Sequence, residues 1–510
     1  MKSVLITSWL ILQVTISCYA QTNPNFTNAF IQTYLPSIEI TMNDSTYQWM
    51  VNPNNIYSSN YQYCTASYKG PNGVVINYDT LGIRLRGNTS RAKYKKSFKF
   101  HFDKFTANQN FYGLKKVNLK AETNDPSLIR EHLVMNMYRE MDVPVARVNH
   151  TKLYINSTFM GVYSNIEQID SRFLKSRFNN KNGNLYKCSW GADLAHLSEV
   201  YNDGIYELKT NEIINDRSHL SAFITFLTTS TDTEFENKIE NYLNVSSYIN
   251  QLVIEVLTGH WDSYAYNKNN YYLYYNTAKN WFEYIPYDTD NTLGIDWVGK
   301  NWSNRNIYSW TPQSGANRPL TNRLLSIHKY AKQYSLAMRL AITTFYNSAT
   351  QVPKANSLKS LIDSAIFLDT YCPLDFGFTY SNFQNSITQN IPNTHVDFGI
   401  EPFINARNSS ANQQLKPIYL SVADVTFDDV VKIYPNPISR NGILNIEISN
   451  QSISINTLTI SNMLGQTVYQ STLSNNKARI ALENFVSGVY IIQFNDPNGV
   501  KQQTKRILIY

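Results

Sequence analysis

The sequence predicts an α+β protein of two or three domains that ends in a small antiparallel β-sandwich. Alternating strand patterns dominate up to about residue 102, and helical patterns dominate between residues 170 and 369. Short alternating strands return in the segment 430–510, at the spacing of a small sandwich. The 510 residues suit two or three domains, and a hydrophobic content of 43% is enough for the chain to bury a core.

Residues 1–20 have the layout of a secretory signal peptide. Lys2 precedes an apolar run over residues 4–16, and the small Ala20 fits the last position before cleavage. Cys18 leaves lipoprotein processing as the less favoured alternative. No later run is long and apolar enough to be a transmembrane segment. We therefore expect a mature chain that begins at Gln21 and leaves the cytosol as a soluble protein.

Charge and cysteine content argue against a nucleic-acid-binding protein and against a protein held together by disulfides or cysteine-bound metal. The net charge of +7 is modest for 510 residues, and the basic residues are spread out, so a nucleic-acid partner is not indicated. Beyond the signal peptide the cysteines are Cys64, Cys188 and Cys372, which allow at most one disulfide and match no metal-binding spacing. Burial must therefore hold the core together.

The first part of the mature chain is expected to be rich in strands. Residues 21–60 form an extension ahead of a main domain at 61–415. Strands are expected at 38–42, 47–51, 62–68, 81–86 and 96–102. The stretch from Arg86 through Asn88 to Ser90 joins the last two. It is a turn by default, but the backbone N–H groups of so small a loop can also face a phosphate.

A helix is expected after the strand that ends at Lys120. Asp125-Pro126 is a cap signal, and an apolar stripe follows at four-residue spacing from Ile129 to Met141. Glu131 is expected on a solvated face. Arg130 lies in the first turn, where a cation opposes the helix dipole, so we expect it to have a partner. A hairpin over residues 148–167 follows.

The polar residues of most interest follow a helix expected at 245–258. Asp262, Asn267 and Asp288 appear in the order of the polar groups in a protein-kinase active site, with a strand between the last two. Asp290 is a plausible second metal ligand. The alternative for all four is that Asp and Asn simply mark turns between strands.

At this point a family resemblance becomes specific. The segment from about residue 60 to 410 resembles the CotH kinase family, secreted or spore-coat proteins with an atypical, bilobal protein-kinase-like fold. The matching stretches are 86–90, 94–99, 124–130, 161–167, 183–186, 206–209, 260–262, 270–274 and 285–290. Two positions depart from the family pattern: Tyr287 stands for the usual Trp, and Thr89 for the usual Ser. Neither change removes a ligand.

The resemblance implies ATP-dependent phosphorylation of Ser or Thr in a protein substrate, with Mg²⁺ or Mn²⁺ as cofactor. It makes Asp262 the catalytic residue and Asn267 and Asp288 metal ligands. It makes Lys96 the phosphate-contacting lysine, although no acid is clearly placed to pair with it. Glu167 then falls at the hinge of the kinase-like small lobe and is expected to border the nucleotide, together with the loop from Arg86 to Ser90.

The last eighty residues look like the C-terminal sorting domain of the type IX secretion system of Bacteroidetes. The similarity lies in residues 434–437, 462–465, 482–485 and 487–490. It implies a secreted or surface-located protein that passes through the periplasm and interacts with that secretion machinery.

Two alternatives to a kinase remain open. A non-enzymatic surface, coat or adhesion protein fits the extracellular location, where ATP is scarce. Retention of Asp262, Asn267 and Asp288 argues against that alternative. A glycosidase that uses Asp262 and Asp288 has no support beyond the two acids.

Overall fold

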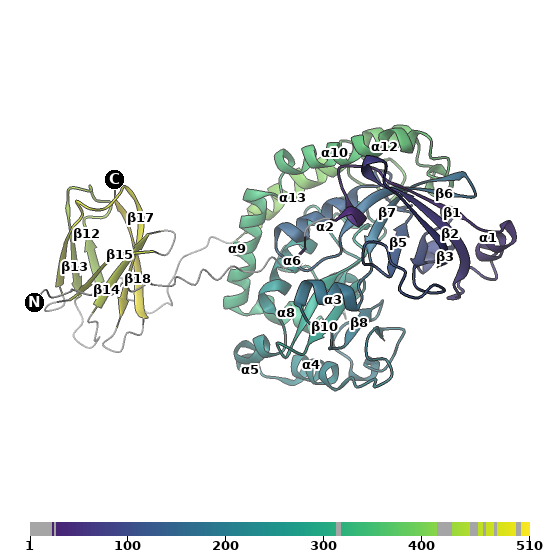
Figure 1. Cartoon of the computed structure of the whole chain (residues 1–510). Coiled ribbons are helices and arrows are strands. Elements are labelled where there is room, and N and C mark those ends of the chain that lie inside the picture. Colours follow the sequence, from purple (N-terminus) through teal and green to yellow (C-terminus); the bar gives the residue numbers. More distant parts are fainter. Residues whose placement is uncertain are drawn as a thin grey trace, which may run out of the picture. The chain divides into compact units, whose positions relative to one another are not determined.

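The computed structural model describes residues 23–24, 27–312, 318–415, 431–448, 457–462, 466–473, 477–495 and 501–509. It divides into two compact units, Met1–Lys416 and Pro417–Tyr510. The first unit is a mixed α/β domain, and the second contains strands only within its described residues (Figure 1). The expected signal peptide lies outside the described residues.

Seven strands near the N-terminus close into a barrel in the order β1-β2-β3-β4-β5-β7-β6. Their bounds are β1 (Ser37–Thr41), β2 (Gln62–Lys69), β3 (Val75–Leu85), β4 (Phe98–His101), β5 (Lys116–Lys120), β6 (Val148–Ile155) and β7 (Thr158–Glu167). Alternate residues such as Phe98, Phe100, Val117 and Leu119 fill its interior. The opposite faces of β4 and β5 therefore point out of the barrel.

Two features of this region differ from expectation. The segment 47–51, expected as a strand, belongs to helix α1 (Asp44–Val51), which Asn43 precedes and whose first turn contains Asp44. Strand β1, which comes from the expected extension, pairs antiparallel with β2 and parallel with β6, and so closes the sheet on itself. Because of this closure the barrel is not a typical kinase small lobe.

The rest of the first unit is mainly helical, with one four-stranded sheet in the order β11-β10-β8-β9. The strands are β8 (Leu185–Cys188), β9 (Tyr206–Leu208), β10 (Tyr271–Asn276) and β11 (Trp281–Pro286). The longer helices are α2 (Arg130–Glu140), α3 (Ser171–Phe178), α4 (Ser218–Thr229), α6 (Val245–Thr258), α8 (Pro319–Ser326), α9 (His328–Thr344), α10 (Ser348–Phe367) and α13 (Ile400–Gln414).

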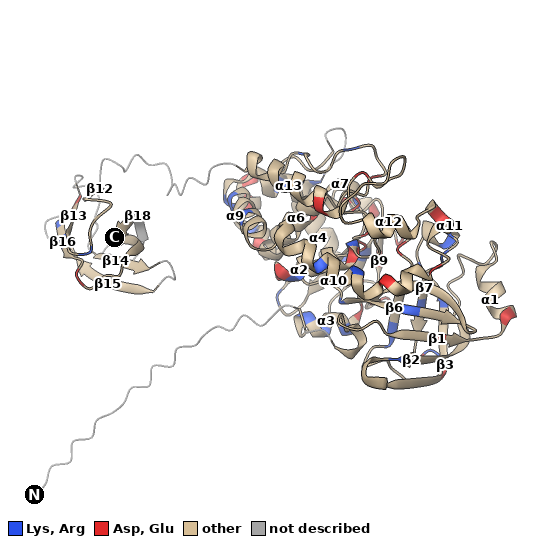
Figure 2. Cartoon of the chain, turned by 90° about the horizontal axis from the view of Figure 1, so that it is seen from above, with Lys and Arg blue, Asp and Glu red and all other residues tan. Residues whose placement is uncertain are grey.

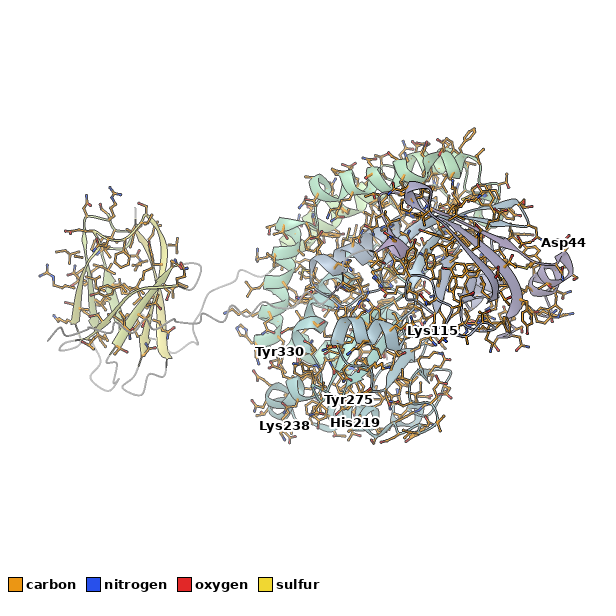
Figure 3. The ribbon with its side chains drawn as sticks, viewed as in Figure 1. Asp44, Lys115, His219, Lys238, Tyr275 and Tyr330 are labelled. Atoms are coloured by element: carbon orange, nitrogen blue, oxygen red, sulfur yellow. The ribbon has the colours of Figure 1, made fainter. Side chains whose placement is uncertain are left out.

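Helix α6 forms the centre of this helical part. Its apolar residues are fully buried, and it packs against α2, α9, α13 and β11. The four-stranded sheet is covered by α4, where the ring of His219 stacks on Tyr275 with centroids 3.8 Å apart (Figure 3). Helix α6 ends at Gly259, whose φ of +69° favours glycine and turns the chain toward Asp262.

The second unit contains two antiparallel sheets. Their orders are β12-β13-β16 and β15-β14-β17-β18. The strands are β12 (Val431–Tyr434), β13 (Ile443–Ile448), β14 (Thr457–Asn462), β15 (Thr467–Thr472), β16 (Lys477–Ala481), β17 (Gly488–Asn495) and β18 (Lys501–Ile509). Side chains of both sheets share one core, which includes Leu444, Ile446, Leu458 and Ile492. Among the described residues no helix of the chain is long and apolar enough to cross a membrane.

Candidate functional site

Asp262 lies at the centre of a group of side-chain amides in the turn that follows α6. Its Oδ1 accepts hydrogen bonds from Asn267 at 2.5 Å and Asn269 at 3.2 Å. Its Oδ2 accepts from Asn270 at 3.0 Å and Asn291 at 3.3 Å. Burial raises the pKa of the Asp262 carboxyl, the amide donors oppose the rise, and the nearby charge of Asp288 adds to it. The short helix α7 (Tyr264–Asn267) brings Asn267 back to Asp262.

A second group forms around Lys120, at the end of β5. Its Nζ lies 2.6 Å from Glu131 Oε2 and 3.3 Å from Asp290 Oδ2, and it donates a short hydrogen bond to Asp288. Glu122 is 3.9 Å away. Strand β5, helix α2 and the segment after β11 thus meet at one ammonium group.

The charges of this group shift one another's pKa values. Burial lowers the pKa of Lys120, but the surrounding carboxylates raise it well above its usual value. Burial opposes ionisation of Asp288, yet Lys120 and Arg86 hold its pKa below the usual value. Burial and the charges of neighbouring acids raise the pKa of Asp290 to about 7. The site holds more carboxylates than its cations neutralise.

The loop after β3 brings Arg86 to this group. Arg86 Nη2 donates to the hydroxyl of Tyr287 at 2.8 Å, directly beside Asp288. Gly87 has a φ of +99°, and a Cβ there would lie 2.0 Å from Ser90 Oγ, so the turn requires glycine. Ser90 is half-buried against this glycine, and Asn88 is exposed.

Two other residues singled out from the sequence lie outside the group. Lys96 Nζ donates to the carbonyl of Arg91 at 2.8 Å. Glu167 is 3% exposed, and its carboxylate binds the guanidinium groups of Arg147 and Arg177 at 2.7 Å and 2.5 Å. Burial opposes the charge of Glu167, but these two cations lower its pKa. Its side chain therefore joins β7 to α3.

The pair Lys120–Glu131 was missed from the sequence. The expectation that Glu131 lies on a solvated face is wrong, because Glu131 is 2% exposed and faces Lys120. The expectation that Arg130 has a partner is confirmed, since its Nη1 lies 2.5 Å from Asp125. A lysine that ends a strand, followed by a glutamate in the first turn of the next helix, was the available signal.

The donor set fits a hard divalent cation. Within the described part of the chain, no three His, Cys, Asp or Glu side chains are arranged to hold a metal ion by themselves. Asp288, Asp290 and Asn267 carry the carboxylate and amide oxygens that Mg²⁺ binds. In the structure Lys120 contacts both carboxylates, and the Asn267 amide donates to Asp262. Asn291 Oδ1 is also buried without a hydrogen-bond partner in the described residues.

Known proteins match both units of the chain. The family described as CotH kinase protein matches residues 83–391, and the secretion system C-terminal sorting domain matches residues 432–510. A solved PorZ structure from Porphyromonas gingivalis is 20% identical and overlaps 18% of this chain and 13% of its own. Its TM-score of 0.15 is too low to show a shared fold.

Several spore-coat proteins and invasins are similar in sequence. Inner spore coat protein H of Bacillus subtilis is 25% identical over 57% of this chain and 79% of that protein. Spore coat protein homolog 1 of Rhizopus delemar is 23% identical over 63% of this chain and 52% of its own length. Invasin CotH3 of the same organism is 21% identical over 74% and 66%. The first unit places this chain in the CotH kinase protein family, and its second unit is a secretion sorting domain.

Proposed function

We propose that this chain is an exported protein kinase that transfers the γ-phosphoryl group of ATP to a Ser or Thr hydroxyl of a protein. The contact of Lys120 with Glu131 and Asp288, beside Asp262 and Asn267, carries the proposal. In protein kinases a strand lysine pairs with a helix glutamate, an Asp orients the substrate hydroxyl, and an Asn and a second Asp hold the metal. The same residue types occur here in the same order along the chain.

The nucleotide site of this proposal includes residues from both parts of the domain, in a bilobal kinase-like arrangement. Lys120, rather than Lys96, takes the role of the phosphate-contacting lysine, because it is the lysine paired with a helix glutamate. Arg86 supplies a second cation from the loop that ends at Ser90, and Asn88 of the same loop faces the phosphates. The Glu167 carboxylate is not proposed to contact the nucleotide, since it already binds two guanidinium groups. Glu167 contributes by holding the proposed hinge in place.

Asp262 is the residue that aligns the substrate hydroxyl and accepts its proton. Its raised pKa increases its affinity for that proton, and its amide partners fix its orientation. Phosphoryl transfer depends mainly on positioning and charge neutralisation, so few side chains are needed. Mg²⁺ or Mn²⁺, held by Asn267, Asp288 and Asp290, would supply the neutralising charge on the phosphates.

The sorting domain directs this activity outside the cytosol. Its family match points to secretion or the cell surface and to the type IX machinery as a partner. We propose that the N-terminal signal peptide first delivers the chain to the periplasm. Truncation before Tyr434 should then leave the protein in the periplasm, and normal surface export of the truncated chain would refute this route.

Kinase activity is tested with labelled ATP and Mn²⁺ on the purified mature chain and candidate protein substrates. Label on the wild type and none on Asp262→Asn or Asp288→Ala supports the proposal. Asp79→Asn is the matched control, because Asp79 is exposed on β3 and carries the same charge. Equal labelling of all four proteins, or no label together with no thermal shift by ATP, overturns it.

A second candidate function is a non-catalytic surface or coat protein. The names of the relatives favour it, since they include an inner spore coat protein and invasins. Under this alternative the Asp262→Asn protein retains every surface or adhesion phenotype of the wild type. Loss of the phenotype in that variant, with its export unchanged, favours the enzyme.

A further inference from the structure

The outer face of β3, β4 and β5 carries a row of cations that extends beyond Lys120. Because side chains alternate along a strand, the residues between the buried ones point out of the barrel. Arg84 lies opposite Lys99, and Lys99 lies opposite Asn118. In the next row Lys116 lies opposite His101, which is not one of the cations because burial and the charge of Lys116 lower its pKa to about 4. Figure 2 shows Lys and Arg at several places along the barrel strands.

This face is turned toward the remainder of the domain. Lys120 on it reaches Asp288, and Lys99 Nζ donates to Gln168 Oε1 at 2.6 Å, just after β7. From the four-stranded sheet, Lys187 approaches to 5.7 Å from the ring centre of Tyr287, which Arg86 also contacts. Cations from two separate sheets therefore meet at Tyr287, and Lys209, which follows β9, is close enough to act on Lys99.

Lys209 pairs with Glu207 at 2.6 Å and His101 lies 2.9 Å from Asp103, but among the described residues no acid forms an ion pair with Lys99, Arg84 or Lys116. Burial, and then the positive charges of Arg84, Lys116, Arg86 and Lys209, lower the pKa of Lys99 well below its usual value. Like charges directly opposite one another on a sheet are destabilising. Arg84 Nε is also buried without a hydrogen-bond partner in the described residues. An anion at this face would reduce the repulsion between the like charges and could accept a hydrogen bond from Arg84 Nε.

We propose that the outer face of β3–β4–β5 around Lys99 binds a chain of phosphate groups, at a subsite separate from the carboxylates of Asp288 and Asp290. Arg84 on β3 and Lys116 on β5 are two strand spacings apart, so the row without Lys120 spans at least about 10 Å. That length suits a linear phosphate chain better than one phosphate. The subsite extends the nucleotide site of the proposed function, on which its role in catalysis rests. Two sources supply such a chain, a nucleoside triphosphate and free condensed phosphate.

The test is titration calorimetry of tripolyphosphate into the full mature chain, without divalent metal. We expect binding, because an anion beside Lys99 compensates the positive charges that face one another there. Lys99→Met should weaken binding at least tenfold. Lys69→Met is the matched control, since Lys69 is an exposed lysine of the same barrel, 3.8 Å from Glu39, and it should change binding less than twofold.

Further measurements distinguish the two phosphate sources and separate a variant that fails to fold from a proposal that is wrong. Lys99→Arg should retain binding, because the guanidinium group keeps the positive charge at this position even if Lys99→Met fails to fold. ATP binding that depends on Lys99 while tripolyphosphate does not bind overturns the condensed-phosphate source, and the reverse overturns the nucleotide source. Equal losses in Lys99→Met and Lys69→Met overturn the subsite.

The same experiment distinguishes this subsite from the kinase proposal. Asp288→Ala should abolish transfer from ATP yet leave metal-free binding of tripolyphosphate intact, because it removes a negative charge. Binding that requires Mn²⁺ and Asp288 but not Lys99 would overturn the subsite and leave the kinase proposal standing. If the protein binds tripolyphosphate through Lys99 but transfers no phosphate, the subsite stands and the kinase proposal is overturned.

Discussion

Lys120 and Lys99 lie on neighbouring strands of one barrel face, and their surroundings have opposite charge. Lys120 is surrounded by carboxylates from α2 and from the segment after β11, which raise its pKa. Burial, and then cations from β3, β5 and the end of β9, lower the pKa of Lys99. Both side chains point outward because side chains alternate along a strand. The charges around each lysine, and so the direction of its pKa shift, come largely from residues distant in the sequence.

This difference separates two parts of the candidate site. The Lys120 end concentrates carboxylates, which suit the metal ion of the proposed kinase, whereas the Lys99 end concentrates lysine and arginine, which suit the phosphates of the proposed subsite. A phosphorylated ligand with its metal needs both parts in one place. If such a ligand binds, its metal and its phosphates would compensate the charges of both ends.

The largest expected effect is that of Lys120→Met. Removal of one partner from a buried ion pair typically costs about 3–5 kcal/mol, because the remaining charges lie buried without compensation. We expect a loss of that size in the free energy of urea unfolding at pH 8. The loss should be smaller at pH 5, where Asp290, with a pKa of about 7, accepts a proton. A loss below about 1 kcal/mol at pH 8 would contradict the central role of Lys120, and Lys69→Met serves as the control.

Glu255 tests how burial acts on an acid whose hydrogen-bond partners are neutral. Its carboxylate accepts from Gln251, Ser263 and the backbone N–H of Ala265, directly below the turn that contains Asp262. Burial raises the pKa of Glu255 to about 7. The folded state therefore binds a proton more tightly than the unfolded state, and stability present below about pH 4.5 is lost as the pH rises through about 7.

Glu255→Gln should remove this part of the pH dependence. The free energy of unfolding of wild type minus variant should fall between pH 5 and 8, by an amount on the order of 3 kcal/mol at most. Urea unfolding at four pH values measures the slope. Glu236→Gln is the control, because Glu236 is exposed on helix α5 (Asp232–Lys238) and removes the same charge. Parallel curves for wild type and Glu255→Gln would exclude Glu255 as the titrating group.

Individual helices and hairpins were predictable, because the spacing of apolar residues and the turn residues within each segment determine them. The stripe from Ile129 to Met141 predicted α2, and the hairpin signal at 148–167 predicted β6 and β7. Closure of the barrel was not predictable, because β1 pairs with β6 more than a hundred residues away. Lys120 was missed for the same reason. Its partners come from three segments, and only their arrangement in space makes the lysine special.

The smallest expected effect is that of Lys99→Met on stability without ligand, and its sign is opposite to that of Lys120→Met. Removal of a cation that faces Arg84 should stabilise the protein by about 0.2–1 kcal/mol. Since the pKa of Lys99 is lowered in the folded state, the unfolded state binds its proton more tightly, and wild-type stability rises with pH up to about 10.5. The advantage of the variant should therefore shrink as the pH rises toward 10.5 in thermal or urea unfolding. A destabilised variant whose deficit grows toward pH 6 would mean that Lys99 is stabilised by an acid, and the two ends of the face would no longer differ in kind.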